Sequence, residues 1–432
     1  AWINKKEEIN ASIKRIENYL IEVNTTKQGE NWREDYVTSA FRDFSMKFDS
    51  EFGGFGTSPK FPSPHNLIFL IRYSKIYKDP NALKMVEITL DNMRLGGIFD
   101  QIGLGFHRYS TDKRWFLPHF EKMLYDQAMI AMAYLEAYQL TKKEKYANVA
   151  NEIFTYVLRD MKYKKGGFFS AEDADSEGEE GKYYTFKYNE ISNIKDIEKF
   201  YEILPEGNWE KKIILRELKD PNSNIKQELL NIRKTKKKPF FDEKVQLDLN
   251  CMWISSLINT YYVNKDKYYL ELAENFFNNL KTKFDENNLH HSYSKNHVFL
   301  EDYAYYTSML LDLYDATMDL NYKNKSLKVY SSTLNKFYDK EKKIFQKNPL
   351  SNNDLFFNPI DIGDGTIPNG NSIMLFNMAR LGKLSDAKTL AQSLYGYLNI
   401  YNNYMISSLK SLDYFNEKNL GKRCGPDGCK SI

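Results

Sequence analysis

The chain has 432 residues, of which 42% are hydrophobic and 28% charged, and its formal net charge at pH 7 is +3. This length and apolar content indicate a folded globular protein with a sizeable core and exclude an intrinsically disordered chain. The 61 basic residues are balanced by 58 acidic ones, which gives no reason to expect nucleic acid as a partner. No apolar stretch approaches the ~20 residues that span a bilayer, so no membrane segment is expected. With three cysteines and no signal-peptide pattern at the N-terminus, we expect a cytoplasmic protein.

Helical periodicity occurs in pairs of segments, and each pair is joined by a short polar link such as "YKDP" or "NKDK". In chain order, helices are predicted near residues 7–28 and 31–47, 64–77 and 80–95, 120–140 and 146–162, 248–264 and 265–284, 300–320 and 322–339, and 368–382 and 385–398.

The connections between pairs are long, and most begin with a glycine or turn followed by aromatic residues, as in "EFGGFG", "KKGGFFSAED" and "EKKIF". Because short and long connections alternate, all the long ones must lie at one end of the helices. Six such pairs in a ring form an all-α (α/α)6 toroid, which we predict as a single domain over residues 1–432. Residues 178–245 are predicted to form a small, mostly irregular and β insertion, and 414–432 a C-terminal tail. A linear α-solenoid of the same pairs is the alternative.

Unusual polar segments lie at or just before the first helix of several pairs, as in "KFPSPHN", "LEDYA" and "DGTIPNGNS". Helix N-termini present unpaired N–H groups and a partial positive charge, which suit hydroxyl, carboxylate or phosphate ligands. The rim with the long connections is therefore the predicted place of function.

The segment "GFHRYSTDKRWFLPHFEKMLYD" (105–126) combines many charges with many rings. Its histidines, His107 and His119, lack the i, i+4 spacing of two metal ligands on one helix. A folded loop can instead bring them to one pocket as two bases, because imidazole titrates near neutral pH. Each histidine can also be a structural hydrogen bonder, and Lys122 and Asp126 can be an ordinary surface ion pair.

The segment "SAEDADSEGEEG" (170–181) supplies carboxylates, of which Asp173 and Asp175 lie nearest the preceding aromatic turn. Paired carboxylates are the groups that glycoside hydrolysis requires. The register does not fit a calcium-binding loop, and a solvated acidic loop is the alternative for Glu179 and Glu180.

No Walker loop, dinucleotide fingerprint or Gly-x-Ser-x-Gly elbow is present, so we expect no cofactor and no serine hydrolase. Cys424 and Cys429 in "RCGPDGCK" are poorly spaced for zinc, and no second pair of ligands completes a site. No metal site is predicted. His290 and His291 lie in a long connection and are weak candidates for a role at the rim.

Five segments resemble the signature segments of the YyaL-like family of spermatogenesis-associated, thioredoxin-domain-containing proteins. They read "GGFGTSPKFPSP", "GGIFDQIGLGFHRYSTDKRWFLPHFEKMLYDQA", "GGFFSAEDADSEGEEGKYYTF", "LEDYAYY" and "PNGNS". The resemblance spans essentially the whole chain. It implies a six-hairpin toroid similar to those of the N-acylglucosamine 2-epimerases, cellobiose 2-epimerases and unsaturated glucuronyl hydrolases. It also implies a thioredoxin-like partner domain that this chain lacks, because "AWINKKEEIN" resembles the segment just after that domain.

One segment departs from the family pattern. "VQLDLNCMW" stands where the family reads close to Leu-Thr-Ser-Trp-Asn-Gly, so that Leu249 replaces the tryptophan and Cys251 the glycine, while Asn250 is retained. The loss of a large ring at a helix start predicts an altered wall of the pocket.

The resemblance implies a sugar-like ligand, which the relatives process with histidine bases in epimerisation or with carboxylates in hydrolysis. The predicted catalytic residues are His107, Arg108, His119, Glu121, Asp173 and Asp175. The predicted substrate-binding residues are Lys60, His65, Trp115, Lys122, Asp126, Asn250, Glu301, Asp302 and Asn371. We expect His107, His119, Asp173, Asp175, Asp302 and Asn371 to border one cavity. A non-catalytic scaffold that works with a separate thioredoxin-like domain is the alternative.

Overall fold

The computed structural model describes residues 5–23, 29, 31–33, 35–221, 223–282, 284, 286, 288–293, 297–352, 355, 357–416, 422–425 and 428–431. Within them, no helix combines the length and the apolar character that crossing a membrane requires.

Six helices form a closed inner ring, in which each helix packs against the next and the last packs against the first. The inner helices are α3 (Pro64–Tyr77), α5 (Leu124–Thr141), α9 (Leu247–Asn264), α11 (Leu300–Thr317), α13 (Gly370–Arg380) and α15 (Ile406–Asn416). This closed ring confirms the predicted toroid and excludes the open solenoid.

Five outer helices each pack against the inner helix that precedes them in the chain. They are α4 (Pro80–Leu95), α6 (Glu144–Tyr156), α10 (Lys267–Leu280), α12 (Leu320–Phe337) and α14 (Leu384–Tyr401). A π-helical turn, η1 (Val157–Met161), extends α6, and a 3-10 turn, η3 (Asn402–Tyr404), follows α14.

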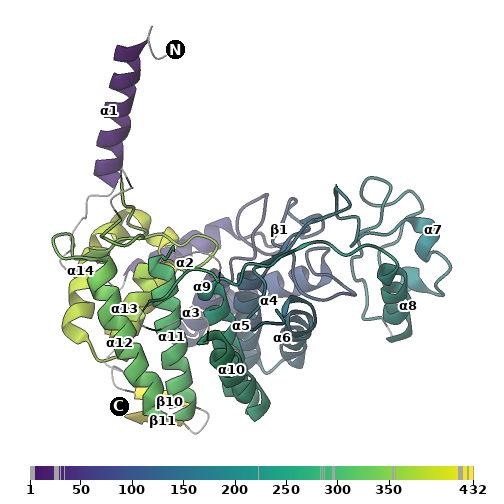
Figure 1. Ribbon diagram of the computed structural model, residues 1–432. Helices are drawn as coiled ribbons and strands as arrows, with labels where there is room; N and C mark the ends of the chain where they lie inside the picture. Colours follow the sequence, from purple (N-terminus) through teal and green to yellow (C-terminus); the bar gives the residue numbers. More distant parts are fainter. Residues whose placement is uncertain are drawn as a thin grey trace.

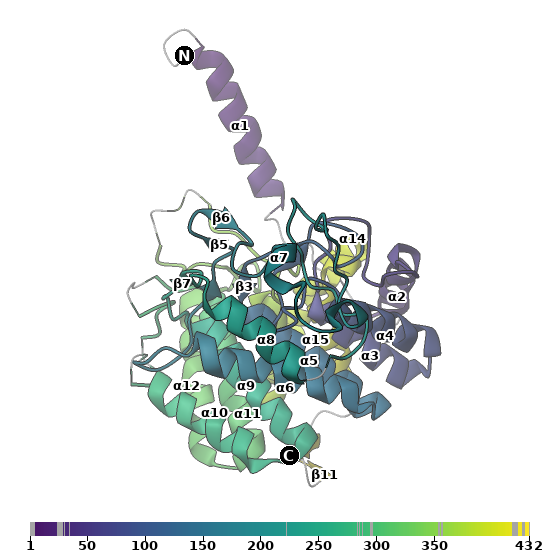
Figure 2. The ribbon, with the colours of Figure 1, turned by 90° about the vertical axis from the view of Figure 1, so that its right-hand side faces the viewer.

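The sixth pair differs from the prediction. The outer helix α2 (Asp35–Lys47) contacts α15, so the two ends of the chain together complete the ring. Helix α1 (Lys6–Val23) projects away from the ring (Figures 1 and 2), and none of its described side chains is buried. The predicted N-terminal pair is therefore wrong. The spacing of Ile9, Ile13 and Ile16 is helical, but Ile13 is 44% exposed and Ile16 57% exposed.

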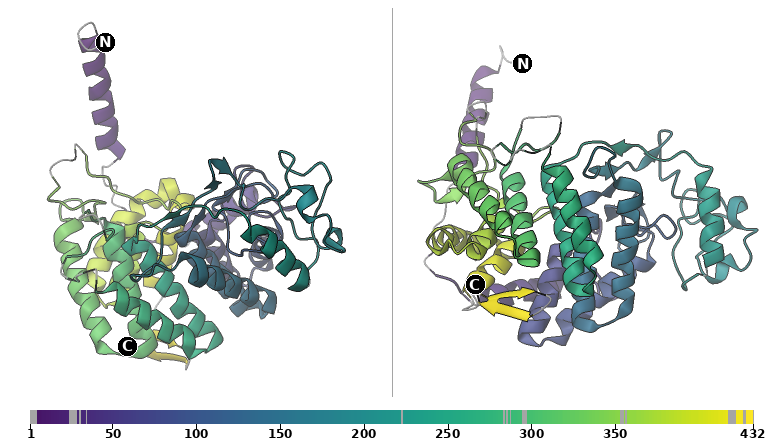
Figure 3. Two further views of the ribbon diagram at one scale, coloured as in Figure 1. Left: turned by 45° about the vertical axis from the view of Figure 1, so that its right-hand side comes forward. Right: turned by 60° about the horizontal axis from the view of Figure 1, so that its bottom comes forward.

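The C-terminal segment also differs from the predicted tail. Residues 414–416 are the end of α15, and the antiparallel strands β10 (Lys422–Gly425) and β11 (Gly428–Ser431) follow. Figure 3 shows this hairpin at the bottom of the molecule, on the side away from α1. The side chains of Cys424 and Cys429 lie outside the described part of the chain.

The short links reverse the chain in a repeated way. The residue after α3, α9 and α11 is left-handed, with φ of 53° at Lys78 and 60° at both Lys265 and Met318. An aspartate follows each of them and caps the next helix; Asp79 accepts from the backbone N–H of Asn81 at 2.8 Å. Such N-caps satisfy amide groups that the first turn leaves unpaired.

The long links form tight turns that side-chain amides tie to the next inner helix. Asn250 accepts from the backbone N–H of Phe168 at 2.8 Å and donates to its carbonyl at 3.2 Å. Asn371 makes the same two bonds, both of 3.0 Å, to Phe345. Gln127 accepts from the N–H of Phe106 at 2.9 Å and donates to its carbonyl at 2.7 Å.

The strands are all short and belong to these turns and to the insertion. They are β1 (Tyr109–Ser110) paired with β2 (Pro118–His119), β3 (Lys122–Met123) with β4 (Ala171–Glu172) and β7 (Phe241–Asp242), β5 (Asp175–Ser176) with β6 (Glu179–Glu180), and β8 (Tyr338–Asp339) with β9 (Ile344–Phe345).

The insertion lies between β4 and β7 and has a small core of its own. It contains α7 (Tyr188–Ile191), the 3-10 turn η2 (Ile197–Lys199) and α8 (Ser223–Lys234). Figure 1 shows α7 and α8 to one side of the ring. Phe186, Ile191, Tyr201, Ile213 and Leu229 are among the buried residues of its core.

A buried ionic cluster fastens the insertion to the ring. Asp100 accepts from Arg233 of α8 at 2.5 Å and from Lys122 of β3 at 2.8 Å, and all three side chains are almost fully buried. Despite burial, the charges of Arg233 and Lys122 hold the pKa of Asp100 far below its usual value. Gly103 is required beside this cluster, because a Cβ there would lie 2.3 Å from Oδ2 of Asp100.

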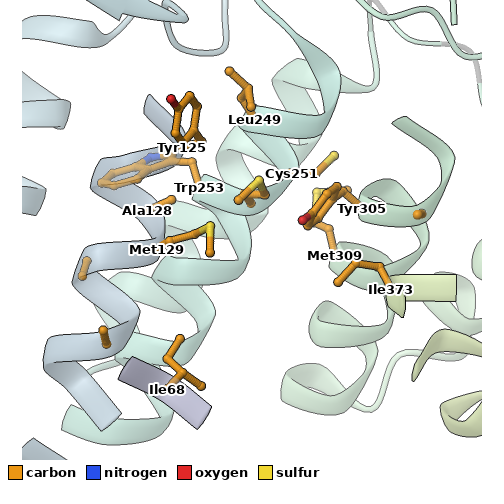
Figure 4. Packing of buried hydrophobic residues seen from close by; sticks show 14 of the residues in the cluster. Ile68, Tyr125, Ala128, Met129, Leu249, Cys251, Trp253, Tyr305, Met309 and Ile373 are labelled. Atoms are coloured by element: carbon orange, nitrogen blue, oxygen red, sulfur yellow. The ribbon is translucent and has the colours of Figure 1, made fainter. Parts of the chain in front are cut away.

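The centre of the ring is apolar. Figure 4 shows side chains from five inner helices in one cluster, among them Ile68, Met129, Cys251, Met309 and Ile373. Tyr125, Leu249 and Tyr305 lie nearer the N-terminal ends of their helices. The polar groups at that rim therefore lie next to an apolar ring centre.

The substitution Asp100→Asn tests the ionic cluster. We expect the free energy of unfolding to fall by about 3–5 kcal/mol at pH 7, because two buried cations lose their shared carboxylate. In the wild type this contribution should be present above about pH 4 and should decline as the pH falls further, since the folded-state pKa is depressed. Denaturant titration at several pH values measures both effects.

Asp91→Asn is the matched control, because its ion pair with Lys145 is largely exposed and should contribute less than about 1 kcal/mol. Equal losses in the two variants would contradict the role of the buried cluster.

Candidate active site at the N-terminal rim of the inner helices

Three predicted substrate-binding side chains are buried and fully engaged. The Lys60 ammonium lies 2.7 Å from each of three oxygens, those of Asp49, the Gly53 carbonyl and the Lys113 carbonyl. Trp115 is fully buried and donates to the Phe52 carbonyl at 2.9 Å. Lys122 belongs to the cluster around Asp100. None of these three is free to contact a substrate, so we correct this prediction.

The predicted base His107 is also enclosed. His107 is 1% exposed, and its Nδ1 lies 2.7 Å from the Phe120 carbonyl oxygen. Burial, the main cause, and the charge of Lys122 lower its pKa to about 3. An imidazole in this position stays neutral and sealed from solvent, so the structure does not support a catalytic role for His107.

Asp173 and Asp175 are at the opposite extreme, because both are exposed beside the β5–β6 turn. Asn250 and Asn371 use their amides to hold Phe168 and Phe345. The expectation that one cavity is bordered by a set of six residues is therefore wrong for most of them; the set was His107, His119, Asp173, Asp175, Asp302 and Asn371.

The structure does bring together a first group of predicted residues at the start of α5. His119 Nδ1 lies 2.7 Å from a Glu180 oxygen, and its Nε2 lies 3.7 Å from Glu121. Arg108 donates to Glu121 at 3.3 Å. Asp126 lies in the first turn of α5, and its buried Oδ2 has no hydrogen-bond partner among the described residues.

The two carboxyl groups of this first group have opposite electrostatic environments. Hydrogen bonding to His119 and the charge of Arg108 lower the pKa of Glu121. Burial raises the pKa of Asp126 well above its usual value; Arg108 opposes this and Glu121 adds to it. Pairs of carboxyl groups whose pKa values are pushed apart are typical of acid–base assignments in active sites.

A second group joins three separate segments at the starts of α9 and α11. His291 Nδ1 lies 2.9 Å from Asp302 Oδ1 and 3.9 Å from Asp248 Oδ1. Asp302 is fully buried in the first turn of α11, where its Oδ2 accepts from the Phe299 N–H at 2.9 Å. The other imidazole nitrogen of His291, Nε2, lies 2.8 Å from the Gln246 amide nitrogen.

Two members of the second group, Asp248 and His291, have raised pKa values. Burial and the charge of Asp302 raise the pKa of Asp248 to about 7. The hydrogen bond to Asp302 and the charges of both aspartates raise the pKa of His291 against the opposing effect of burial, which is the largest single influence. A carboxyl and an imidazole in such proximity exchange protons readily at physiological pH.

The same three side chains offer a donor set for a cation. Asp248, His291 and Asp302 can each provide one ligand atom, and these atoms lie within 4.8 Å of one another. Two carboxylate oxygens and one imidazole nitrogen suit a divalent transition metal.

Two further predicted residues lie at the starts of inner helices, and Glu301 is close to this group. Glu301 accepts from the Gly370 N–H at 3.2 Å, and burial raises its pKa. His65, at the start of α3, has a buried Nδ1 without a hydrogen-bond partner in the described chain, and burial lowers its pKa.

Tyrosines line the space toward the ring centre. Burial raises the pKa of Tyr125 to about 12, and the charge of its neighbour Asp126 adds to this effect. Tyr305 is within the influence of Asp248, since the charge of that carboxylate adds to the effect of burial on its pKa. Figure 4 shows Leu249, the residue that replaces the family tryptophan, beside Tyr125.

Asp248 and His291 carry the strongest chemistry of the rim, yet Asp248 was not among the predicted site residues and His291 was only a weak candidate. Two features of the sequence point to these residues. Asp248 is an acid in the first turn of a predicted helix, and His290 and His291 are adjacent histidines in the long link that follows that helical pair. Sequence spacing alone did not connect them, because 43 residues separate the two side chains (291 − 248).

The closed ring of helical pairs defines the class of protein, the six-hairpin toroid. A D-mannose isomerase superposes with a TM-score of 0.60 at 10% identity, over 88% of this chain and 96% of that one. A cellobiose 2-epimerase from Bacillus thermoamylovorans gives 0.55 at 11% identity, over 85% and 88% of the two chains. A GH76 α-mannanase from Bacteroides thetaiotaomicron gives 0.56 at 12% identity, over 90% and 96%. At these identities the likeness concerns the fold.

Sequence comparison then identifies the relatives. The chain is 31% identical to human spermatogenesis-associated protein 20, over 79% of this chain and 52% of that protein. It is 29% identical to the mouse protein, over 81% and 53% of the two chains. No family model matches the chain. The chain is thus a homologue of spermatogenesis-associated protein 20 over about 80% of its length, which confirms the resemblance of the motifs. It spans about half the length of these curated relatives.

Asp302→Asn tests the second group. We expect the pKa of His291 to fall, because the imidazolium loses a hydrogen bond and a neighbouring negative charge. The pKa of Asp248 should fall as well, since a like charge is removed. NMR titration of the imidazole C–H signals measures the change at His291. His65 is the internal control, because its charged neighbours are Asp364 and Lys410. An unchanged His291 pKa would show that the pair with Asp302 does not form.

Proposed function

We propose that this protein is a carbohydrate-active enzyme that transfers a proton at a carbon atom of a reducing sugar, as in isomerisation or 2-epimerisation. The observation that carries the proposal is the group of Asp248, His291 and Asp302 at the helix N-termini of one rim, in which the pKa of Asp248 is raised to about 7 and that of His291 is raised. The fold is one that sugar epimerases, isomerases and mannanases share.

In the proposed reaction, Asp302 positions the imidazole through Nδ1 and stabilises its protonated form. His291 or Asp248 takes a proton from the carbon next to the carbonyl group of the open-chain sugar. The electron pair of the broken C–H bond moves into the carbonyl to give an enediolate, and the proton returns to a carbon atom. A base is most effective when its pKa lies near the working pH, which fits a carboxyl with a pKa of about 7.

Glycoside hydrolysis is the second candidate, and the group at α5 favours it. The surroundings favour the ionised form of Glu121 and the neutral form of Asp126, which suits the two carboxyls to the roles of base and acid on either side of a glycosidic bond. Arg108 and His119 would hold Glu121 in place.

Exchange of solvent deuterium separates the two reactions. The protein is incubated with a panel of reducing sugars in deuterium oxide, and loss of the C2 proton signal is followed by NMR. We expect exchange in the wild type and a loss of about 10²–10⁴-fold in Asp248→Asn and in His291→Gln, because a general base is removed. Asp173→Asn, which alters an exposed carboxylate, should exchange at the wild-type rate.

Oligosaccharide hydrolysis is measured in parallel. If sugars are released without exchange, and Glu121→Gln and Asp126→Asn abolish release, hydrolysis replaces isomerisation as the function. If sugars raise Tm but neither reaction occurs with or without added Zn²⁺ or Mn²⁺, the enzyme proposal fails. The non-catalytic scaffold with a thioredoxin-like partner then becomes the better account.

A further inference from the structure

A cavity inside the ring of helices is a candidate site that the proposed sugar reaction does not use. A cavity of about 940 Å³ is bounded by the C-terminal halves of α3, α5 and α9 and by the first turn of α15. Much of its wall is apolar and includes Phe69, Tyr73, Ile76, Met132, Leu135 and Val263. A partly open cavity of this size with a largely apolar wall and a few polar groups is typical of a small-molecule site.

The charged residues of the cavity wall are unbalanced. Three cations, Arg72, Lys75 and Lys410, face a single carboxylate, that of Glu136. Arg72 forms a bidentate salt bridge with Glu136, in which Nη2 lies 2.8 Å from Oε1 and Nε lies 3.2 Å from Oε2. This pair neutralises both groups, and the two lysines remain as an excess of positive charge.

Lys410 differs from Lys75 in its surroundings. Lys75 is exposed, whereas Lys410 is partly buried and has no hydrogen bond or ion pair with any described residue. The ring of Phe376 lies 5.9 Å from its ammonium group. Burial and the charge of Arg72 lower the pKa of Lys410 to about 8, and the more distant carboxylates of Glu136, Asp364 and Asp312 oppose this.

An ammonium group in this position is in an unfavourable state. With a pKa of about 8 it is largely charged at pH 7, yet it has neither a counter-ion nor full contact with water. Buried charges in proteins are almost always paired, because desolvation of an unpaired ion is costly. The nearby hydroxyl of Tyr262, on the same wall, is a second buried group that has no hydrogen-bond partner in the described structure.

We propose that this cavity binds a small organic anion, whose charged group pairs with Lys410 and whose apolar body contacts the aromatic and aliphatic wall. A carboxylate and a phosphate monoester share this chemistry. The proposal does not rest on the proposed sugar reaction, because Lys410 is not among the residues assigned to that reaction.

The test uses two probes, sodium hexanoate and inorganic phosphate, at constant ionic strength with chloride as the balancing ion. Isothermal titration calorimetry measures their binding to the full chain. We expect saturable binding of at least one probe and a loss of at least tenfold in affinity in Lys410→Met. Lys75→Met is the matched control and should change the affinity by less than about threefold, because its charge is solvated. Preference for hexanoate identifies a carboxylate ligand, and preference for phosphate a phosphorylated one.

The pH dependence and the melting temperature provide a second readout. Affinity should decline above about pH 8 as Lys410 loses its proton, and the bound anion should raise the pKa of that lysine. Without an anion, Lys410→Met should melt no lower than the wild type, since an unpaired charge is removed. If neither probe binds the wild type, or if Lys410→Met or a second variant, Lys410→Gln, binds like the wild type, the proposal is overturned.

Discussion

The two-residue reversal after an inner helix is the constraint on which the rest of the structure depends. One left-handed residue and one capping residue turn the chain through the smallest possible link, as at Lys78–Asp79 and Met318–Asp319. A helix that turns back so abruptly must lie against its partner. All connections with room for additional residues therefore lie at the other rim, and six helix N-termini converge there.

This geometry explains why the proposed site is built from distant segments. Each long link returns to a helix start, where a side-chain amide can bind its backbone, as Asn250 does for Phe168 and Asn371 for Phe345. The link that Gln127 holds carries Arg108 to Glu121. The link before α11 brings His291 to Asp302. Because the ring centre next to them is apolar, the ionisable groups at this rim are desolvated on the side that faces the centre. This desolvation raises the pKa values of buried carboxyl groups such as Asp126 and Asp248.

The fold was largely predictable because link length and helical period are local properties. The exceptions have physical reasons. Helix α1 has the apolar spacing of a packed helix, but that face meets solvent. The sixth inner helix, α15, was missed because Ser407, Ser408 and Ser411 fill a tightly packed position that the pattern of large apolar residues does not reveal; all three are buried.

The candidate site was less predictable, because the sequence alone does not show whether a charged residue binds a substrate or stabilises a loop. Lys60 and Lys122 are in polar, aromatic surroundings that suggested a ligand, yet each satisfies carbonyl and carboxylate oxygens of its own chain. Burial separates the two cases, and burial depends on the insertion that covers this side of the ring. Asp302 could be predicted because it lies at the start of a helix. Its partner His291 could be assigned only once the structure showed the path of the link that carries it.

The closing of the ring by α2 and α15 has a consequence for biogenesis. Tyr36 donates to Asn399 at 2.9 Å across 363 residues of sequence, so this seam joins nearly the first and nearly the last turns of the toroid. Until translation delivers α15, the flanks of α3 and α13 have no neighbour, and their apolar surface is accessible to chaperones or to other nascent chains. The five earlier hairpins can assemble as an open arc in the meantime, and circularisation is necessarily the final step.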